Sequence, residues 1–265
     1  GDVADPDGGV ITYDWEQYDL GAASPPEGDN GGRPIFRSYS PTREPRRSFP
    51  SLQYVLSPSG IPPVTRDIEG TSYLVGEFMP TTGRVLNFRI TLRDNQGGIS
   101  TESIAVGVWT AMGPFRVTSP NTAVSWPAGS QQTVTWDVAN TTASPINAAN
   151  VRISLSDNGG DSFDYILADN VPNDGSESVV LPCVNTTQAR IKVQSVNNEF
   201  VNFYDVSHVN FSVQQPPSVP GTPGALDLSF SANIMNFGSP GKIYAMAPQA
   251  CGKILVGGEF YSMEG

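Results

Sequence analysis

The sequence predicts an all-β protein, and three observations support this fold class. Glycine (27) and proline (23) are frequent among the 265 residues, which favours turns over long helices. Runs such as TVTW and FRITLR alternate apolar and polar residues, which is the pattern of a half-buried strand. No stretch of about 12 residues keeps a helical period. The length fits one to three domains.

Residues 1–112 are predicted to form a first β-sandwich module. ITYDWEQY, RVLNFRITLR and the run after the DNQGG turn all alternate, so each predicts a strand with one apolar face. A long insertion, residues 19–83, separates the first two strands and is rich in Pro, Gly, Ser and Arg. Loops longer than ~15 residues are uncommon in compact domains, and they are either functional or partly disordered.

Residues 113–215 are predicted to form a second β-sandwich of ordinary size. TVTWDV and VRISLS each place three apolar residues on one face, and SVVLP, ARIKVQSV and VNFSV supply later strands. Turn signals recur roughly every 8–20 residues, as in a sandwich. The Pro-rich stretch 216–224 predicts an extended, semi-rigid linker.

Residues 225–265 change in character. ALDLSF, GKIYAMA and CGKILVGGEF are short strand-like runs separated by glycine. This stretch is too short to bury a core alone. We expect one partial unit of a stacked β-repeat.

Composition excludes several classes of partner. The net charge of −11 would repel nucleic acid and anionic membrane surfaces, and it also keeps a secreted protein dispersed. Nothing approaches ~18 consecutive apolar residues, so no membrane insertion is predicted. Charged residues make up only 15%, while Thr, Ser and Asn are abundant. Such a neutral polar surface is typical of extracellular β proteins, so we expect secretion.

The residue counts also argue against catalysis. The chain has one histidine, His208, and two cysteines, which excludes most metal and nucleophile chemistry. His208 lies in VSHVNFSV, where Val209, Phe211 and Val213 face one way. His208 is therefore predicted to face solvent rather than to act as a base. We predict no catalytic residues and no enzyme activity.

Several motifs carry resemblances to known families. Through DPDGGVITYDWEQ and LRDNQGG, the first module resembles a cadherin- or PKD-like immunoglobulin-type domain. The motifs ITYDWEQYDLG, PIFRSYSPT, RVLNFRITLRDN, GPFRVTSPN, QTVTWDVANT and VRISLSDNGG make 1–215 similar to the C-terminal β-sandwich region of secreted bacterial reprolysin-like metalloproteases and related surface proteins. LDLSF, GKIYAMAPQ and CGKILVGGEF resemble the propeller-like delta-60 repeat of large bacterial surface proteins.

These resemblances imply two tandem Ig-like β-sandwiches followed by a partial delta-60-type repeat, residues 225–265. The peptidase motif HExxH is absent, so an extracellular accessory role is implied rather than hydrolysis. In the modules that 1–112 resembles, a further strand precedes the DPDG turn. The first sandwich is therefore predicted to be incomplete beside Ile11–Gln17.

Three sources could fill that open edge, whose unpaired N–H and C=O groups invite pairing. Sequence upstream in a parent protein could do so, or a neighbouring copy by strand addition. The third source is the segment YLVGEF, residues 73–78, folding back. Intrachain pairing costs less entropy than recruiting a partner, which favours 73–78.

Asp5, Asp7 and Asp94 are candidate calcium ligands. Asp5 and Asp7 flank a turn, Asp94 lies in LRDNQGG, and in cadherin-like sandwiches the equivalent stretches can approach the same end. Hard cations need several oxygen ligands. The alternative is that these residues are turn formers only. No other cofactor is predicted.

Cys183 and Cys251 are predicted to form a disulfide between the second module and the repeat. Both resembled families usually carry other residues at these positions, so two departures in one chain suggest a paired change. Export would supply an oxidising environment. The alternative is two buried free thiols.

Five arginines of the insertion concentrate positive charge in an acidic chain: Arg33, Arg37, Arg43, Arg46 and Arg47. Arginine forks bind carboxylate and phosphate, so these residues predict a clamp for an acidic glycan or lipopolysaccharide. The alternative is pairing with carboxylates of the same chain and stacking on Phe36, Tyr39 and Phe49, which the excess of internal acids favours.

The sequence therefore favours a non-catalytic structural or adhesive segment of a large secreted or surface-attached bacterial protein, as a stalk or filament subunit. Its partners would be other domains of the parent protein, other copies paired by strands, or surface glycans. A glycan-binding module, or an accessory region of an extracellular enzyme whose catalytic domain lies elsewhere, is the alternative. An exposed aromatic row beside a groove would favour glycan binding.

Overall fold

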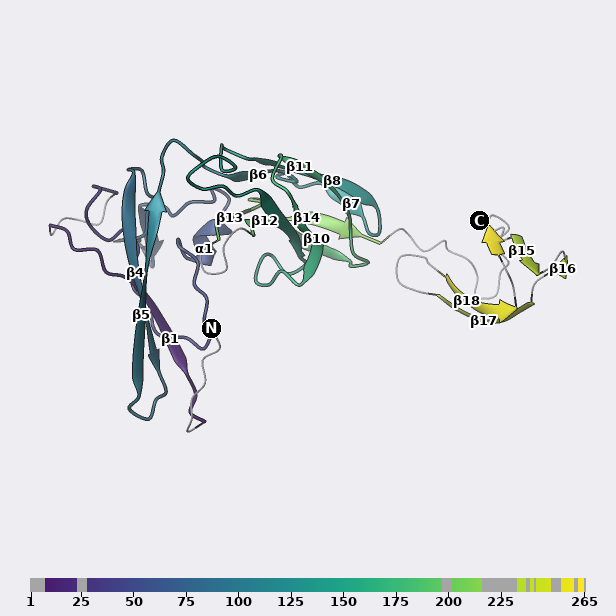
Figure 1. Ribbon diagram of the computed structural model, residues 1–265, viewed down its shortest axis with the longest axis horizontal. Coiled ribbons are helices and arrows are strands. Elements are labelled where there is room, and N and C mark those ends of the chain that lie inside the picture. Colours follow the sequence, from purple (N-terminus) through teal and green to yellow (C-terminus); the bar gives the residue numbers. More distant parts are fainter. Residues whose placement is uncertain are drawn as a thin grey trace.

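Nearly all regular structure in the described part of the chain is β, so the predicted fold class is confirmed (Figure 1). The computed structural model describes residues 8–22, 28–196 and 202–215, and the strand segments 233–236, 239–240, 242–248, 254–259 and 262–264. In these ranges the single helix, α1 (Leu52–Val55), has four residues. No helix in the described part has the length and apolar character needed to cross a membrane.

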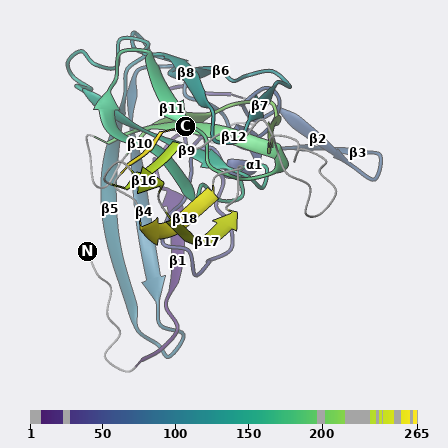
Figure 2. The ribbon, with the colours of Figure 1, turned by 90° about the vertical axis from the view of Figure 1, so that its right-hand side faces the viewer.

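The first module is built on a three-stranded antiparallel sheet. Its strands, in the order β1-β4-β5, are β1 (Thr12–Gln17), β4 (Arg84–Arg93) and β5 (Ile99–Val108). Trp15 lies opposite Ile90, and Phe88 lies opposite Ile104, so the alternating apolar residues share one face as predicted. The sheet extends away from the second module as a long arm (Figures 1 and 2).

The described part of the long insertion is folded onto this sheet. Phe36 and Phe49 are residues of the insertion, and their side chains pack against Phe88 of β4. The ring centroids of Phe49 and Phe88 are 4.4 Å apart. The insertion also contains α1 and a hairpin of β2 (Thr65–Ile68) and β3 (Thr71–Leu74). Its apolar side chains thus complete the core of the first module.

The outer edge of β1 is covered by the insertion, but not by the segment 73–78. Tyr13 and Thr42 exchange two backbone hydrogen bonds, with N···O distances of 2.7 and 3.0 Å. The expectation for 73–78 was wrong, because β3 pairs with β2 through a two-residue turn. Glu69 and Gly70 form this turn with φ of 50° and 79°, the geometry that closes a tight local hairpin.

The second module is a sandwich of two sheets, the arrangement of an immunoglobulin-like fold. One sheet has the order β10-β9-β12-β14-β7, with β13 also paired to β12, and the other has the order β11-β8-β6. The strands are β6 (Arg116–Ser119), β7 (Ser125–Pro127), β8 (Gln131–Asp137), β9 (Asn150–Ser156), β10 (Tyr165–Pro172), β11 (Ser176–Val180), β12 (Thr186–Ser195), β13 (Tyr204–Val206) and β14 (Phe211–Gln214).

The core between these sheets contains the residues that alternation predicted. Val134 and Trp136 of β8 and Val151, Ile153 and Leu155 of β9 are all buried. Because one face of each sheet is removed from water, this core supplies the main hydrophobic stabilisation of the module.

The last part of the chain also contains β structure. It has β15 (Asn233–Asn236), β16 (Ser239–Pro240), β17 (Lys242–Pro248), β18 (Ile254–Glu259) and β19 (Ser262–Glu264). Strands β17 and β18 form an antiparallel pair, and β15 pairs with β16 and β19. The predicted linker 216–224 lies outside the described residues.

The first two modules meet at a junction of specific contacts. Arg190 donates a hydrogen bond to the carbonyl of Leu56 at 3.4 Å, and Tyr204 donates one to the Ser48 hydroxyl. Gly60 lies against His208, since a Cβ at position 60 would be 2.3 Å from Nε2. The expectation that His208 faces solvent was wrong: its side chain is 19% exposed, because the first module packs on it.

Candidate functional site: an arginine and tyrosine pocket

Asp29 fixes the insertion to the start of β4. It accepts hydrogen bonds from the backbone N–H groups of Thr81 (3.0 Å) and Thr82 (3.2 Å), and it pairs with Arg84 at 2.9 Å. Burial alone would raise the pKa of Asp29, but the N–H group of Gly31 and these donors outweigh burial and lower the pKa to about 2. This buried carboxylate therefore links the beginning of the insertion to its end and to the first residue of β4.

A second buried carboxylate, Glu77, forms the base on which the site rests. Its side chain is fully buried and accepts hydrogen bonds from both the N–H and the hydroxyl of Ser51, each at 2.8 Å. Arg47 pairs with it at 3.5 Å and also donates to the carbonyl of Trp15. Burial lowers the pKa of Arg47, opposed by the charge of Glu77. Arg47 is therefore a structural cation rather than a free one.

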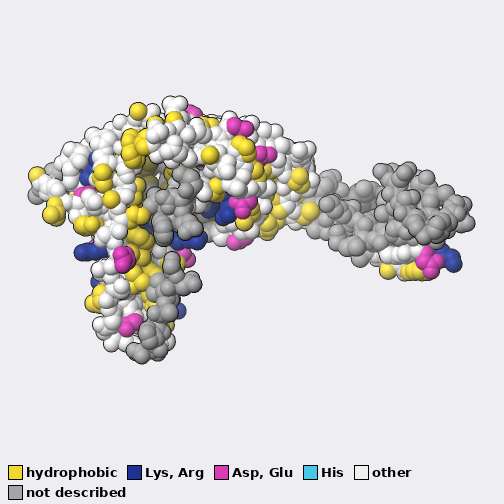
Figure 3. All heavy atoms as spheres, viewed as in Figure 1, with side chains coloured by type: hydrophobic (Ala, Val, Ile, Leu, Met, Phe, Trp, Pro, Cys, Tyr) yellow, Lys and Arg dark blue, Asp and Glu magenta, His cyan; other side chains and the backbone are white. Residues whose placement is uncertain are grey.

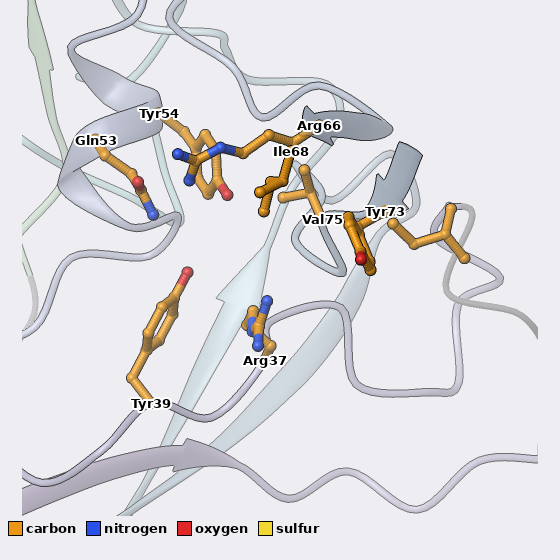
Figure 4. Close-up of a pocket in the computed structure, with 9 residues that line it drawn as sticks. Arg37, Tyr39, Gln53, Tyr54, Arg66, Ile68, Tyr73 and Val75 are labelled. Atoms are coloured by element: carbon orange, nitrogen blue, oxygen red, sulfur yellow. The ribbon is translucent and has the colours of Figure 1, made fainter. Parts of the chain in front are cut away.

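Above this base lies a pocket of about 180 Å³. It is open to solvent and lies between the β2–β3 hairpin, α1 and the stretch that carries Arg37 and Tyr39 (Figure 4). None of its lining residues is acidic, although the chain as a whole carries a net charge of −11. The lining residues are Arg37, Tyr39, Gln53, Tyr54, Arg66, Ile68, Tyr73, Leu74 and Val75.

The polar ends of the lining side chains converge. Figure 4 shows Tyr39, Gln53 and Tyr54 directing their polar ends into the same space, with Arg66 beside Tyr54. Burial raises the pKa of Tyr54, as do the nearby Tyr39 and the carboxylate of Glu77, whereas Arg66 and Arg37 oppose the rise. Both guanidinium groups are therefore within electrostatic reach of the Tyr54 hydroxyl.

Tyr39 is held in place by cations on its ring. The guanidinium carbons of Arg37 and Arg47 lie 5.4 and 4.8 Å from its centroid. Such contacts stabilise by about 0.5–1 kcal/mol at exposed sites. They leave the Tyr39 hydroxyl directed into the pocket (Figure 4).

This arrangement suits an anionic ligand that also has an apolar face. Guanidinium groups bind carboxylate or sulfate with short, charge-assisted hydrogen bonds. Phenol and amide groups can orient hydroxyls, and exposed rings such as Tyr73, 52% exposed, offer flat apolar surface. Convergent polar groups in a partly apolar hollow are typical of small-ligand sites.

The five arginines singled out in the sequence have different roles. Only Arg37 lines the pocket. Arg33 donates through Nε to the carbonyl of Gly28 at 3.2 Å, and Arg47 pairs with Glu77 and stacks on Phe49. Arg43 and Arg46 are exposed and lie outside the lining.

Sequence reasoning did not find Arg66, Tyr54 or Tyr73 as site residues. Arg66 and Tyr73 face each other across the β2–β3 hairpin, in register. The glycine turn between two short alternating runs, TRDI and TSYL, was the available signal for this hairpin. No local signal places the hairpin beside α1.

Asp94 stabilises the turn in which it lies. Its carboxylate accepts the N–H groups of Gln96 (2.7 Å) and Gly98 (2.8 Å), and these hydrogen bonds lower its pKa. Asp5 and Asp7 lie outside the described residues. No group of three or more His, Cys, Asp or Glu side chains suited to a metal occurs in the described part. Calcium binding stays a prediction.

Cys183 takes part in a disulfide bond. The predicted partner, Cys251, lies outside the described residues, so the bridge between these two cysteines stays a prediction. An oxidised cysteine is nevertheless typical of secreted proteins.

No known protein family matches the sequence, and no curated protein matches it either. Among solved structures, the chain is similar to a chimeric titin Z1Z2-Z1Z2 tandem functionalized with a GRGDS exogenous peptide from fibronectin. The identity is 16%, the match covers 57% of this chain and 73% of that chain, and the TM-score is 0.24. A likeness of this strength carries no argument about function.

Proposed function

We propose that this chain is a non-catalytic adhesive segment of a secreted or surface-attached protein, and that the pocket of the first module binds an acidic saccharide. The observation that carries the proposal is the composition of the lining. Two arginines and three tyrosines line it, none of the lining residues is acidic, and the nearby carboxylate Glu77 is paired with Arg47, in a chain of net charge −11. A local positive site in an acidic protein favours an anionic ligand over a neutral one.

Secretion is part of this proposal. The disulfide at Cys183 and the surface rich in Thr, Ser and Asn support an oxidising, extracellular setting. An accessory role beside an extracellular enzyme would use the same pocket to hold the parent protein on an acidic polysaccharide.

The proposal is tested by isothermal titration with an oligomer of uronic acids and with a neutral oligosaccharide of equal length. Arg37→Gln and Arg66→Gln each remove one cation from the pocket, and Arg43→Gln is the matched control outside it. Loss of a charge-assisted hydrogen bond costs about 1.5–3 kcal/mol, which is roughly a 10- to 100-fold loss of affinity.

We expect the acidic oligomer to bind the wild type and the Arg43 variant equally, and to bind the two pocket variants at least about tenfold more weakly. Added salt should weaken binding, because exposed charges are screened. Equal affinity for all three variants, or equal affinity for the neutral oligomer, would refute the proposal.

A second function, as a spacer that holds neighbouring domains apart, is supported by the junction between the modules. Arg190 donates to the carbonyl of Leu56 across it, and its pKa is lowered by burial. Gly160 also lies against Leu56, since a Cβ there would be 2.4 Å from Cδ2. Contacts of this kind favour a fixed angle between the two modules over a flexible connection.

A further inference from the structure

Strand β5 has an open edge. It pairs with β4 along all ten residues without a register shift. The Asn87 carbonyl accepts the Tyr18 N–H at 3.0 Å, so odd-numbered residues of β4 direct their backbone groups toward β1 and even-numbered ones toward β5. By the same alternation, Thr101, Ser103 and Ala105 direct their N–H and C=O groups away from the sheet. No hydrogen bond reaches these groups from the described residues.

The two edge strands of this sheet differ in how far other segments cover their backbone groups. At the β1 edge, Thr42 pairs with Tyr13, and Arg47 donates to the carbonyl of Trp15. Proteins usually protect an edge strand with lysine, proline, a bulge or a covering segment. The sequence ISTESIAVGV of β5 contains no Lys, Arg or Pro, and its register is regular. A long, unprotected edge of this kind is suited to strand addition.

We propose that β5 pairs antiparallel with β5 of a second copy of this chain, about a two-fold axis at Ser103. This inference does not depend on the pocket or its ligand. The axis sets Ser103 opposite itself, Thr101 opposite Ala105, and Ile99 opposite Gly107 of the second copy. Every outward-facing backbone group from residue 99 to 107 then has a partner. The two three-stranded sheets become one sheet of six strands.

The ends of the paired strands are complementary in size. Ile99 is 67% exposed, more than any other large hydrophobic residue in the described strands, and the axis brings it opposite a glycine. The Trp109 ring lies over Gly107, since a Cβ there would be 2.2 Å from the ring. Trp109 and Val85 are 47% and 55% exposed, so their side chains offer an apolar surface against which Ile99 of the second copy would pack. Hydrophobic side chains also run along this sheet in Figure 3.

The charges permit this register. Glu102 is the single charged residue of β5. The two-fold sets it opposite Ile104 of the second copy, so the two Glu102 residues are diagonal neighbours, roughly 7–8 Å apart, rather than directly opposite. Like charges directly opposite each other would destabilise the pair.

The size of the contact sets its strength. A ten-residue strand is about 33 Å long. Pairing one such edge buries less than the ~1,200 Å² of a standard stable interface. We therefore expect weak association, and because a two-fold contact is closed, we expect a dimer rather than an open chain.

Sedimentation velocity of the whole chain, from about 10 µM to about 1 mM, tests this proposal in the range of weak complexes. Ser103→Lys and Ser103→Glu each set two like charges opposite each other on the axis. Thr133→Lys adds the same charge at an exposed position of the central strand β8 and is the matched control. The decisive sample is an equimolar mixture of the two Ser103 variants, in which opposite charges would face each other.

The proposal expects a dimer for the wild type and for the Thr133 variant, at least a tenfold weaker dimer for each Ser103 variant alone, and recovery in the mixture. A wild type that stays monomeric at about 1 mM overturns it. So does association that the Ser103 variants leave unchanged, or a mixture that does not recover. Circular dichroism of each variant establishes that a lost dimer is not a lost fold.

Discussion

Asp29 should make the free energy of unfolding of the first module depend on pH in the acidic range. Its side chain is fully buried, and its pKa is lowered from 3.8 to about 2 by donors that include Thr81, Thr82 and Arg84. At about 1.36 kcal/mol per pKa unit, this shift corresponds to about 2 kcal/mol of stability. Because the folded pKa lies below the unfolded one, this contribution is fully present above pH ~4 and is lost as the pH falls through ~2.

Asp29→Asn removes the charge and should lower the free energy of unfolding at pH 7 by about 2 kcal/mol. The difference between the two proteins should shrink as the pH falls from ~4 and should vanish near pH 2. Urea denaturation at a series of pH values measures this difference, and Asp67→Asn, in the exposed strand β2, controls for the loss of a surface charge.

Amide hydrogen exchange gives a local readout of the same interaction. The N–H groups of Gly31, Thr81 and Thr82 donate to Asp29, so they should lose protection in the Asn variant before the rest of the module does. A stability difference that is the same at pH 7 and pH 2 would contradict the linkage argument, because it would mean that the charge of Asp29 does not contribute.

Two further changes probe the second module and the junction. Asn173→Ala should destabilise by about 1–3 kcal/mol, because it leaves the buried Nε1–H of Trp136 without an acceptor. A lower urea midpoint, followed by tryptophan fluorescence, measures this. Gly60→Ala and Gly70→Ala both strain a positive φ, of 67° and 79°, but only the first sets a Cβ against His208. We expect Gly60→Ala to lower stability by about 0.5–1 kcal/mol more than Gly70→Ala and to widen the small-angle scattering distance distribution, whereas equal effects would mean that the contact contributes nothing.

The strands were predictable where alternation is long. RVLNFRITLR predicts a strand that the structure places at Arg84–Arg93, and its residues Leu86 and Phe88 are buried. Ten residues of period two leave little room for another interpretation, because a shift by one residue would expose the whole apolar set. The same holds for Val134 and Trp136 in β8.

The insertion was not predictable in this way, because long-range polar contacts determine its fold. Asp29 and Arg84 are 55 residues apart, and Ser51 and Glu77 are 26 apart. Each partner alone looks like an ordinary polar residue of a loop. The pocket depends on these contacts, so the cluster of arginines in the sequence indicated the right region but included only one lining residue, Arg37.

The parallel pairing of β7 with β14 has a consequence for tension along the chain. Ser125 lies opposite Ser212 and Pro127 opposite Gln214, with further hydrogen bonds from Ala128 to Gln214 at 2.7 Å and from Ser212 to Val124 at 2.8 Å. In a parallel pair, a pull on the upstream end of one strand and the downstream end of the other slides the strands past each other. These hydrogen bonds then bear load simultaneously instead of opening one at a time. Rupture under force is governed by the unfolding rate, so this short seam would slow the extension of the module under a pulling load.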